Sequence, residues 1–359
     1  MSNRGLGLVL CLVAACVRPT PAEQPPVAWP ALCASYYTSV TDPHLDVDQF
    51  GAWLAKVKVT CTRAWLLDAW AIGEKGSDGQ FLRGQYEGAI PIQRRADGRF
   101  DLAQWNEAYF ARLRRYVEVM NSHGVWPHLT FLDLYTWSEG KAPLPFVPDA
   151  DKGPFRHNVN GVRWGGPDAT TLAALPDPWM KEFICRVVKT LHGTSWAAEV
   201  GNEMPDRGLH TRMAAALRAC GWTGDVTVNR DATSPGQYWN MDVGKTFSRI
   251  AFHGFLDMSY LDTPYPEEAS AGRPTTFREM WGKVEPARVI VSSDGGGGNP
   301  SHLPALKAVA CDTLKRGATY EHQLALKRRR FYGDGTLQMA DLAIDEAFLL
   351  SLTKCTGTH

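Results

Sequence analysis

Short apolar runs alternate along this chain with segments in which apolar residues recur every three or four positions. The first pattern is typical of buried strands, and the second is typical of amphipathic helices. Eight runs are expected to form strands: Ala31–Tyr37, Val59–Leu67, Val125–Leu132, Ser195–Gly201, Asp225–Asn229, Arg249–Phe255, Arg288–Ser293 and Ala318–Gln323. The one at Asp225 is the weakest, because it is short and flanked by polar residues.

The segments between the expected strands have helical patterns. Two apolar stripes are Val47, Phe50, Leu54 and Val57, and then Phe110, Leu113, Val117 and Met120. Asp177 and Pro178 are expected to open a third helix that Gly193 closes. Later helices are expected from Leu303 to near Gly317 and from Leu337 to Leu352.

Eight strands, each followed by a helix, predict an α/β fold: a (β/α)8 TIM barrel over residues 31–359, in a single domain with long βα loops. The alternative is a doubly wound open sheet, but no Gly-rich phosphate turn follows the first strand. The segments Asp68–Arg99 and Asp133–Pro176 are expected to be βα loops, which lie at the catalytic end of a barrel.

Aromatic residues are frequent in the segments expected on the loop side. They are Trp70, Tyr135, Trp137, Trp164 and Trp239. Flat aromatic rings pack against the apolar faces of sugars, so Trp137, Tyr135 and Trp239 are candidate substrate contacts, with Trp137 the first choice. Trp53, Trp105 and Trp179 fall on helical stripes and are expected in the core.

The chain has 359 residues, with 38 basic and 38 acidic side chains. This length suits one barrel-sized domain. The balanced charge argues against a nucleic-acid partner, and the short basic run Arg328–Arg330 is interpreted as a solvated loop.

The N-terminus has the pattern of an export signal. Arg4 precedes an apolar stretch that is too short to span a bilayer, and small residues follow it. Val13-Ala14-Ala15-Cys16 resembles a bacterial lipobox, which implies a signal peptide over residues 1–15, lipidation of Cys16 and a Pro-rich tether over 16–30. The protein is therefore expected to be exported and lipid-anchored to a bacterial membrane. It is also expected to be monomeric. The alternative is an ordinary signal peptide cut near Ala22.

Six cysteines remain beyond Cys11 and Cys16, and an even number in an oxidising compartment favours disulfides. Fifteen pairings are possible. The expected barrel favours the three that join neighbouring units: Cys33–Cys61, Cys185–Cys220 and Cys311–Cys355. The spacing shows no metal-binding motif, and no metal or organic cofactor is implied.

Two acidic residues follow expected strands at the end where a barrel carries its chemistry. Asn202 and Glu203 follow the fourth strand, and Asp294 follows the seventh. Cleavage of a glycosidic bond needs two carboxyl groups, one to protonate the leaving oxygen and one to attack the anomeric carbon or direct a water. The pattern therefore predicts a glycoside hydrolase in which Glu203 and Asp294 supply the two carboxyl groups.

With these residues the chain resembles the clan of retaining (β/α)8 glycoside hydrolases that includes cellulases, mannanases and xylosidases. In that clan an Asn-Glu pair ends strand four, its Glu is the general acid/base, and a nucleophilic carboxylate ends strand seven. The resemblance therefore implies that Glu203 is the general acid/base and Asp294 the nucleophile or the base that directs a water. Strand two carries an Arg and strand six a His or Tyr, positions that Arg63 and His253 occupy here. The resemblance implies that Arg63 keeps the strand-seven carboxylate ionised, Asn202 binds a sugar hydroxyl, and His253 orients a carboxylate or hydroxyl.

One position departs from the clan, because Asp294 stands where Glu is usual. The shorter side chain withdraws the carboxylate by roughly 1.5 Å, whereas a retaining mechanism needs about 5–5.5 Å between carboxyls and an inverting one about 6.5–9.5 Å. Retention, inversion and loss of activity all stay open. Glu321, on the eighth strand, is the reserve candidate for the second carboxyl.

Each candidate also has a purely structural interpretation. Arg63 would be an interior cation paired with Glu199, and His253 a core histidine. Glu203 would be an acid at a helix N-terminus, and Asp294 part of a Gly-rich turn. The alternative function is a non-catalytic glycan-binding lipoprotein on a degenerate barrel. An esterase is not supported, since the chain has no GxSxG motif.

Overall fold

The computed structural model describes most of the region expected to form the barrel. The described residues are 27–29, 31–43, 45–67, 89–132, 157–161, 177–202, 207–231, 243–253, 258–262, 276–281, 284–293, 301–324 and 342–355. The expected signal peptide and most of the tether lie outside these ranges.

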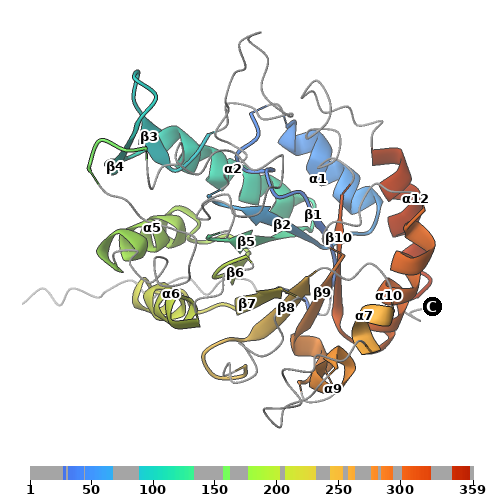
Figure 1. Cartoon of the computed structure of the whole chain (residues 1–359). Helices are drawn as coiled ribbons and strands as arrows, with labels where there is room; N and C mark the ends of the chain where they lie inside the picture. Colours follow the sequence, from blue (N-terminus) through green and yellow to red (C-terminus); the bar gives the residue numbers. More distant parts are fainter. Residues whose placement is uncertain are drawn as a thin grey trace, which may run out of the picture.

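Eight parallel strands close into a barrel, with the helices outside it (Figure 1). Around the barrel the order is β1-β10-β9-β8-β7-β6-β5-β2. The strands are β1 Leu32–Ser35, β2 Cys61–Trp65, β5 Trp126–Thr130, β6 Ala197–Glu199, β7 Val226–Asp231, β8 Arg249–His253, β9 Val289–Ser292 and β10 Thr319–Gln323. Each lies within or overlaps one of the eight predicted runs, so the (β/α)8 barrel is confirmed.

The helices follow the predicted stripes. They are α1 Val47–Lys56, α2 Glu107–Ser122, α5 Asp177–Thr190, α6 Arg207–Ala219, α10 Leu303–Lys315 and α12 Ala343–Leu352, with the shorter α7 Ser259–Asp262, α9 Phe277–Trp281 and η5 Pro286–Arg288. Asp46 caps α1 by accepting a hydrogen bond from the Gln49 amide, and Asn106 caps α2 through the Tyr109 amide. Such caps satisfy amides that a first helical turn leaves without a partner.

Two local predictions were wrong, and the bounds of one weakly predicted strand differ. The segment predicted as a long loop after the second strand ends in a hairpin, formed by β3 Ile92–Arg94 and β4 Phe100–Trp105. Trp105 is therefore the last residue of a strand, and it is only partly buried. The strand predicted over Asp225–Asn229, β7, extends to Asp231, beyond its predicted end. Its polar residues Thr227 and Asn229 are buried inside the barrel, so they do not interrupt the strand.

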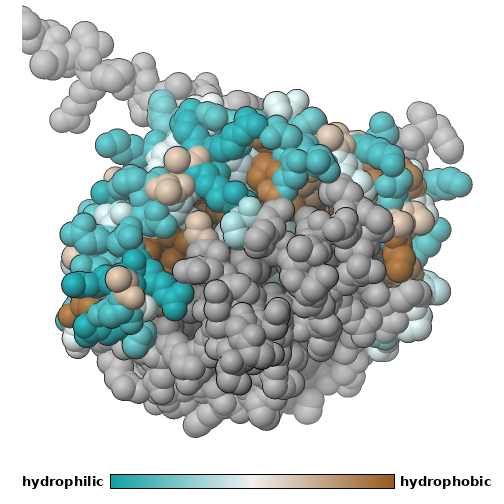
Figure 2. Space-filling model, turned by 90° about the horizontal axis from the view of Figure 1, so that it is seen from above, coloured by the Kyte–Doolittle hydropathy of each residue, from teal (hydrophilic) through white to brown (hydrophobic). Residues whose placement is uncertain are grey.

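The apolar core lies mainly between the strands and the surrounding helices. Phe50, Leu113, Phe183 and Leu306 are among its fully buried members. A small second cluster fills the barrel at the N-terminal ends of the strands, with Cys33, Cys61 and Trp126 at its centre. Polar residues dominate the coloured part of the face shown in Figure 2, with a few apolar patches between them. In the part of the chain that the structure describes, no helix has both the length and the apolar character needed to cross a membrane.

The three predicted disulfides are present: Cys33–Cys61, Cys185–Cys220 and Cys311–Cys355. The first joins register partners on β1 and β2. The second joins α5 to the residue after α6, and the third joins α10 to a residue shortly after α12. Each pair links neighbouring units because consecutive units of a barrel are also neighbours in space.

The Cys33–Cys61 bridge closes a loop with a sequence separation of 28 residues. A cross-link of this length restricts the unfolded chain, so Cys33→Ala with Cys61→Ala should lower the free energy of unfolding by about 2–4 kcal/mol. Denaturant unfolding with the other two bridges kept oxidised measures this change. The same double replacement at Cys185 and Cys220 is the comparison, and a loss below about 1 kcal/mol at Cys33–Cys61 would contradict the prediction.

Candidate active site

A group of buried polar side chains lies inside the barrel. Side chains alternate between the two faces of a strand, so on β2 Arg63 shares the interior face with Cys61 while Ala64 faces the helices. The same alternation places charged or polar residues of the other strands inside. The interior group consists of Arg63, His128, Glu199, Asn229, His253, Ser292 and Glu321, all of them buried.

Arg63 is at the centre of this group. Its Nε donates to Glu199 Oε2 at 2.8 Å, and its Nη2 donates to Glu199 Oε1 at 2.6 Å. Nη2 also donates to Asn202 Oδ1 at 2.8 Å. Nη1 points to the opposite side of the barrel, 3.6 Å from Glu321 Oε1. One guanidinium on β2 thus connects the end of β6 with β10.

The paired groups stay charged. Burial by itself would raise the pKa of Glu199, but the attraction and hydrogen bonds of Arg63 hold it below its usual value. Burial likewise acts to lower the pKa of Arg63, yet Glu199 and Glu321 raise it well above its usual value. The result is a bidentate ion pair, the arrangement in which a buried guanidinium best satisfies its donors.

Arg63 also fixes the orientation of the Asn202 amide. A guanidinium has only donors, so the atom that faces it must be the amide oxygen. The Asn202 backbone is held as well, because its amide donates to the Leu132 carbonyl at 2.8 Å. The side-chain Nδ2 is left without an acceptor among the described residues. Asn202 therefore offers a donor of fixed direction immediately before Glu203.

Glu321 is the second carboxyl inside the barrel. Ser292 on β9 donates its hydroxyl to Glu321 Oε1 at 3.0 Å. Burial raises the pKa of Glu321, and nearby Glu199 raises it further, against the lowering effects of Arg63, His253 and Ser292. Because Arg63 forms its short bonds with Glu199, it does not compensate both carboxylates, and Glu321 is the one that retains a proton more easily.

The two interior histidines lie on either side of this charge pair. His128 Nε2 is 3.6 Å from Glu199 Oε2, and burial lowers the pKa of His128 to about 4. His128 is therefore neutral near pH 7. His253, the last residue of β8, contacts the side chain of Asn229 on β7. Both rings fill space inside the barrel, and the His128 ring is uncharged there near pH 7.

The raised pKa of Glu321 predicts a pH dependence of stability. The folded protein keeps a proton on Glu321 at pH values where the unfolded chain has released it, so this residue's contribution to stability is lost as the pH rises above about 4.5. Glu321→Gln cannot titrate, and the free energy of unfolding of this variant relative to the wild type should therefore increase with pH above that value. Denaturant unfolding of both proteins between about pH 4 and pH 8 measures this difference. A constant difference across the series would contradict the prediction.

The structure brings only some of the predicted site residues together. Arg63, Asn202, His253 and Glu321 all lie inside or at the end of the barrel. The structural alternative for Arg63, a pair with Glu199, is the one observed. Other predicted residues lie outside the described ranges: Glu203, Asp294, Tyr135, Trp137, Trp239 and Cys16.

Sequence reasoning did not single out four members of the interior group: His128, Asn229, Ser292 and, except as a partner for Arg63, Glu199. A register argument would have found two of them. His128 pairs with Arg63 in the register of β2 and β5, and Ser292 pairs with Glu321 in that of β9 and β10. The register between neighbouring strands is set by how the barrel closes, so the residue pattern of a single strand does not predict it.

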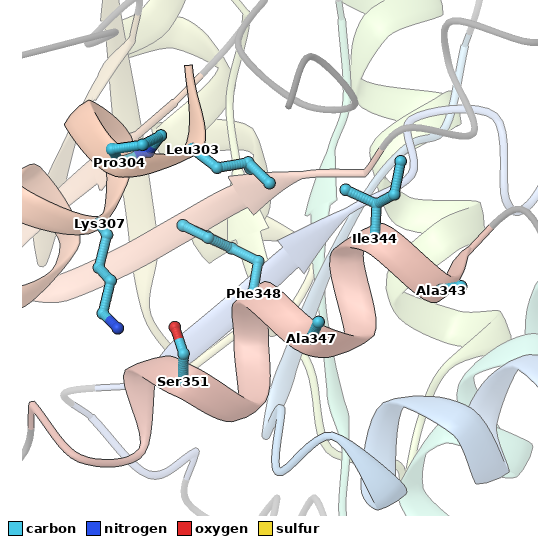
Figure 3. Close-up of a pocket in the computed structure, with 8 residues that line it drawn as sticks. All are labelled: Leu303, Pro304, Lys307, Ala343, Ile344, Ala347, Phe348 and Ser351. Atoms are coloured by element: carbon cyan, nitrogen blue, oxygen red, sulfur yellow. The ribbon is translucent and has the colours of Figure 1, made fainter. Parts of the chain in front are cut away.

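A surface groove lies elsewhere, between α10 and α12 (Figure 3). Leu303, Ile344 and Phe348 supply much of its lining, and Lys307 is its charged residue. The groove has no acidic lining residue and is on the helical exterior. It is therefore not suited to a two-carboxylate reaction.

Comparisons with known proteins show the fold. No family model and no curated protein sequence matches this chain. Among solved structures, an endo-1,4-β-mannanase from Rhizomucor miehei matches with a TM-score of 0.54 and 13% identity, over 90% of this chain and 95% of that chain. A glycoside hydrolase family 5 enzyme from Prevotella bryantii B14 matches with a TM-score of 0.52 and 11% identity, over 90% and 95%.

A third match is longer than this protein. The exo-β-1,4-mannosidase from Opitutaceae bacterium strain TAV5 has a TM-score of 0.53 and 11% identity, over 91% of this chain and 59% of that chain. At such identities the similarity establishes a shared barrel architecture. Activity has to be argued from the residues of the site.

Proposed function

We propose that this protein is a glycoside hydrolase that cleaves O-glycosidic bonds of a poly- or oligosaccharide with two carboxyl groups. Glu203 acts as general acid/base, and Asp294 acts as nucleophile or as the base that directs a water. Tyr135, Trp137 and Trp239 are proposed to pack against sugar rings. No step requires a metal or an organic cofactor.

The observation that carries this proposal is the bond between Arg63 and Asn202. Because Arg63 is itself held by Glu199, the Nδ2 of Asn202, the residue before Glu203 in the sequence, has a fixed direction. A donor in that place suits the sugar hydroxyl next to the anomeric carbon, where a hydrogen bond strengthens in the transition state. The residue that precedes the candidate acid is thus positioned before substrate arrives.

The position before Asp294 is also fixed. The Ser293 amide donates to the Glu321 carbonyl at 3.0 Å, which ties the end of β9 to β10. Both candidate acids therefore follow anchored residues at the C-terminal ends of barrel strands, where barrel enzymes carry their catalytic groups. The names of the structural matches, a mannanase, a mannosidase and a family 5 glycoside hydrolase, agree with this chemistry.

The second candidate is a glycan-binding lipoprotein without activity. The shorter Asp at the end of the seventh strand favours it, since a withdrawn carboxylate reaches the anomeric carbon less readily. The two candidates differ in one observable quantity. The enzyme releases reducing ends, whereas the binding protein saturates with sugar and leaves it intact.

A panel of polysaccharides separates these candidates. β-Mannans, β-glucans, xyloglucan and xylan would be incubated with the protein and scored for new reducing ends, with sugar binding measured in parallel. Release on one glycan supports hydrolysis, and NMR of the first anomer formed then assigns retention or inversion. Saturable binding with no release on any bound glycan would replace the first candidate with the second.

We also propose that the protein is exported and anchored to a bacterial membrane by lipid on Cys16. The support is the lipobox-like sequence and the three disulfides, which form in oxidising compartments. Metabolic labelling with a fatty acid, in the wild type and in Cys16→Ser, tests the anchor. Equal labelling of the two chains would reject it.

A further inference from the structure

The end of the barrel opposite the candidate site is rich in basic residues. Helices of a (β/α)8 barrel run antiparallel to its strands, so their last turns all lie at the N-terminal ends of the strands. Four of these last turns carry a basic residue: Lys56 in α1, Lys189 in α5, Arg218 in α6 and Lys315 in α10. All four side chains are exposed.

More basic residues lie in the loops at the same end. Lys58 follows α1, Lys245 precedes β8, Arg316 follows α10 and Lys354 follows α12, and all are exposed. The acids found there are already paired: Asp225 with Arg249, Glu285 with Arg288, and Asp312 with Arg316. Lys56 is also paired, with Glu346 of α12. Positive charge is therefore in excess at this end.

Four of the lysines carry uncompensated charge. Among the described residues, Lys189, Lys315 and Lys354 form no ion pair, and the same holds for Lys58. The whole chain has equal numbers of basic and acidic side chains, 38 of each. An excess of positive charge at one end thus requires an excess of negative charge elsewhere, and the molecule is electrically polarised.

The N-terminal segment enters the structure at this same end. Trp29 packs against Trp126, the first residue of β5, with ring centroids 4.4 Å apart. Its indole Nε1 donates to Asp225 at 2.7 Å, and the Arg249 guanidinium lies 4.2 Å from its ring centroid. These contacts fix Trp29 against the N-terminal ends of three strands. Any tether that precedes it must leave from this end.

The length of the tether limits how far this end can be from an anchor. Val27 lies eleven positions after Cys16, and a segment of that length spans at most about 40 Å when fully extended. A lipid on Cys16 would therefore keep the basic end close to the membrane surface. The basic residues and the attachment point of the tether thus both favour the N-terminal end of the barrel as the end that faces the membrane.

We propose that the N-terminal end of the barrel rests on a bilayer that contains anionic phospholipids, with Lys189, Lys315 and Lys354 facing the phosphate groups. The mouth of the barrel, with the candidate site, then points away from the membrane toward extracytoplasmic glycans. The orientation rests on the proposed anchor, whereas the affinity of the basic end for anionic lipid does not. Neither depends on hydrolytic activity.

Vesicle binding without the anchor tests the surface. The processed chain that begins at residue 16, with Cys16→Ser, would be mixed with vesicles of phosphatidylcholine alone or with phosphatidylglycerol added. Binding is expected only to the anionic vesicles and should be lost in about 0.5 M salt, where exposed charges are screened. Each basic residue near such a surface contributes about fivefold to affinity.

Two triple variants provide the comparison. Lys189→Gln with Lys315→Gln and Lys354→Gln should weaken binding at least tenfold. The control replaces Arg95, Lys181 and Lys307 by Gln; these residues are equally exposed but lie in the β3–β4 hairpin and in the N-terminal halves of α5 and α10. The control triple is expected to change affinity by less than about twofold.

Two results of the vesicle experiments would contradict lipid recognition by the basic end. Equal binding to neutral and anionic vesicles, or equal losses in the two triple variants, would show that the basic end does not recognise lipid. Binding to an acidic polysaccharide such as polygalacturonate, without vesicle binding, would assign that end to a glycan instead.

In vesicles carrying the lipidated protein, an amine-reactive reagent should modify Lys181 and Lys307 more than Lys189 and Lys354. The reverse order would reject the orientation.

Discussion

Glu203→Gln is expected to lower kcat on the natural glycan by about 100-fold to 10,000-fold. Gln has nearly the same shape as Glu but cannot donate a proton to the leaving oxygen or accept one from water. The hydrogen bond between Arg63 and Asn202 does not involve the side chain of Glu203, so substrate binding should persist. Reducing-end release under saturating substrate measures the loss.

The control for this variant is Glu118→Gln, the same chemical change on the exposed face of α2. It should leave kcat within about twofold, since surface substitutions away from special features have small effects. Asp294→Asn should lose about as much activity as Glu203→Gln if it supplies the second carboxyl. Undiminished turnover in Glu203→Gln would remove this residue from the mechanism and with it the proposed hydrolysis.

Arg63→Met is expected to lower the free energy of unfolding by about 3–5 kcal/mol. The guanidinium is fully buried and forms two hydrogen bonds with Glu199 and one with Asn202. Its removal leaves the Glu199 carboxylate without a cation inside the barrel, and an uncompensated buried charge is strongly destabilising. Denaturant unfolding at pH 7 with the disulfides oxidised measures the change.

A second replacement separates the cost of the unpaired charge from the loss of packing. Arg63→Met combined with Glu199→Leu removes both charges, and it should recover most of the lost stability because an apolar pair often replaces a buried ion pair without penalty. The exposed pair Arg115–Asp48 is the control, and Arg115→Met should cost less than about 1 kcal/mol. A loss of that small size in Arg63→Met, or no recovery in the double variant, would contradict this account of the ion pair.

The sequence determined the architecture of this protein. The period of the apolar residues is a local property, so the runs around Arg63 and Glu321 are enough to identify the strands that carry these residues. Once eight strands and their helices are in order, the neighbour relations of a barrel follow, and they predict the pairing of Cys33 with Cys61. The β3–β4 hairpin was missed because β3 has only three residues and lies within the segment that was interpreted as a loop.

Only the tertiary structure decided what the interior charges do. The sequence placed Arg63 and Glu199 on interior faces and offered Glu199 as one possible partner of Arg63, but it did not select this pair. That choice depends on strand register, on the tilt of the barrel and on which carboxylate comes within 3 Å of the guanidinium. The raised pKa of Glu321 also depends on the tertiary structure. It results from burial and from the position of Arg63, which lies closer to Glu199 than to Glu321. These are distances across the barrel, and the order of residues along the chain does not give them.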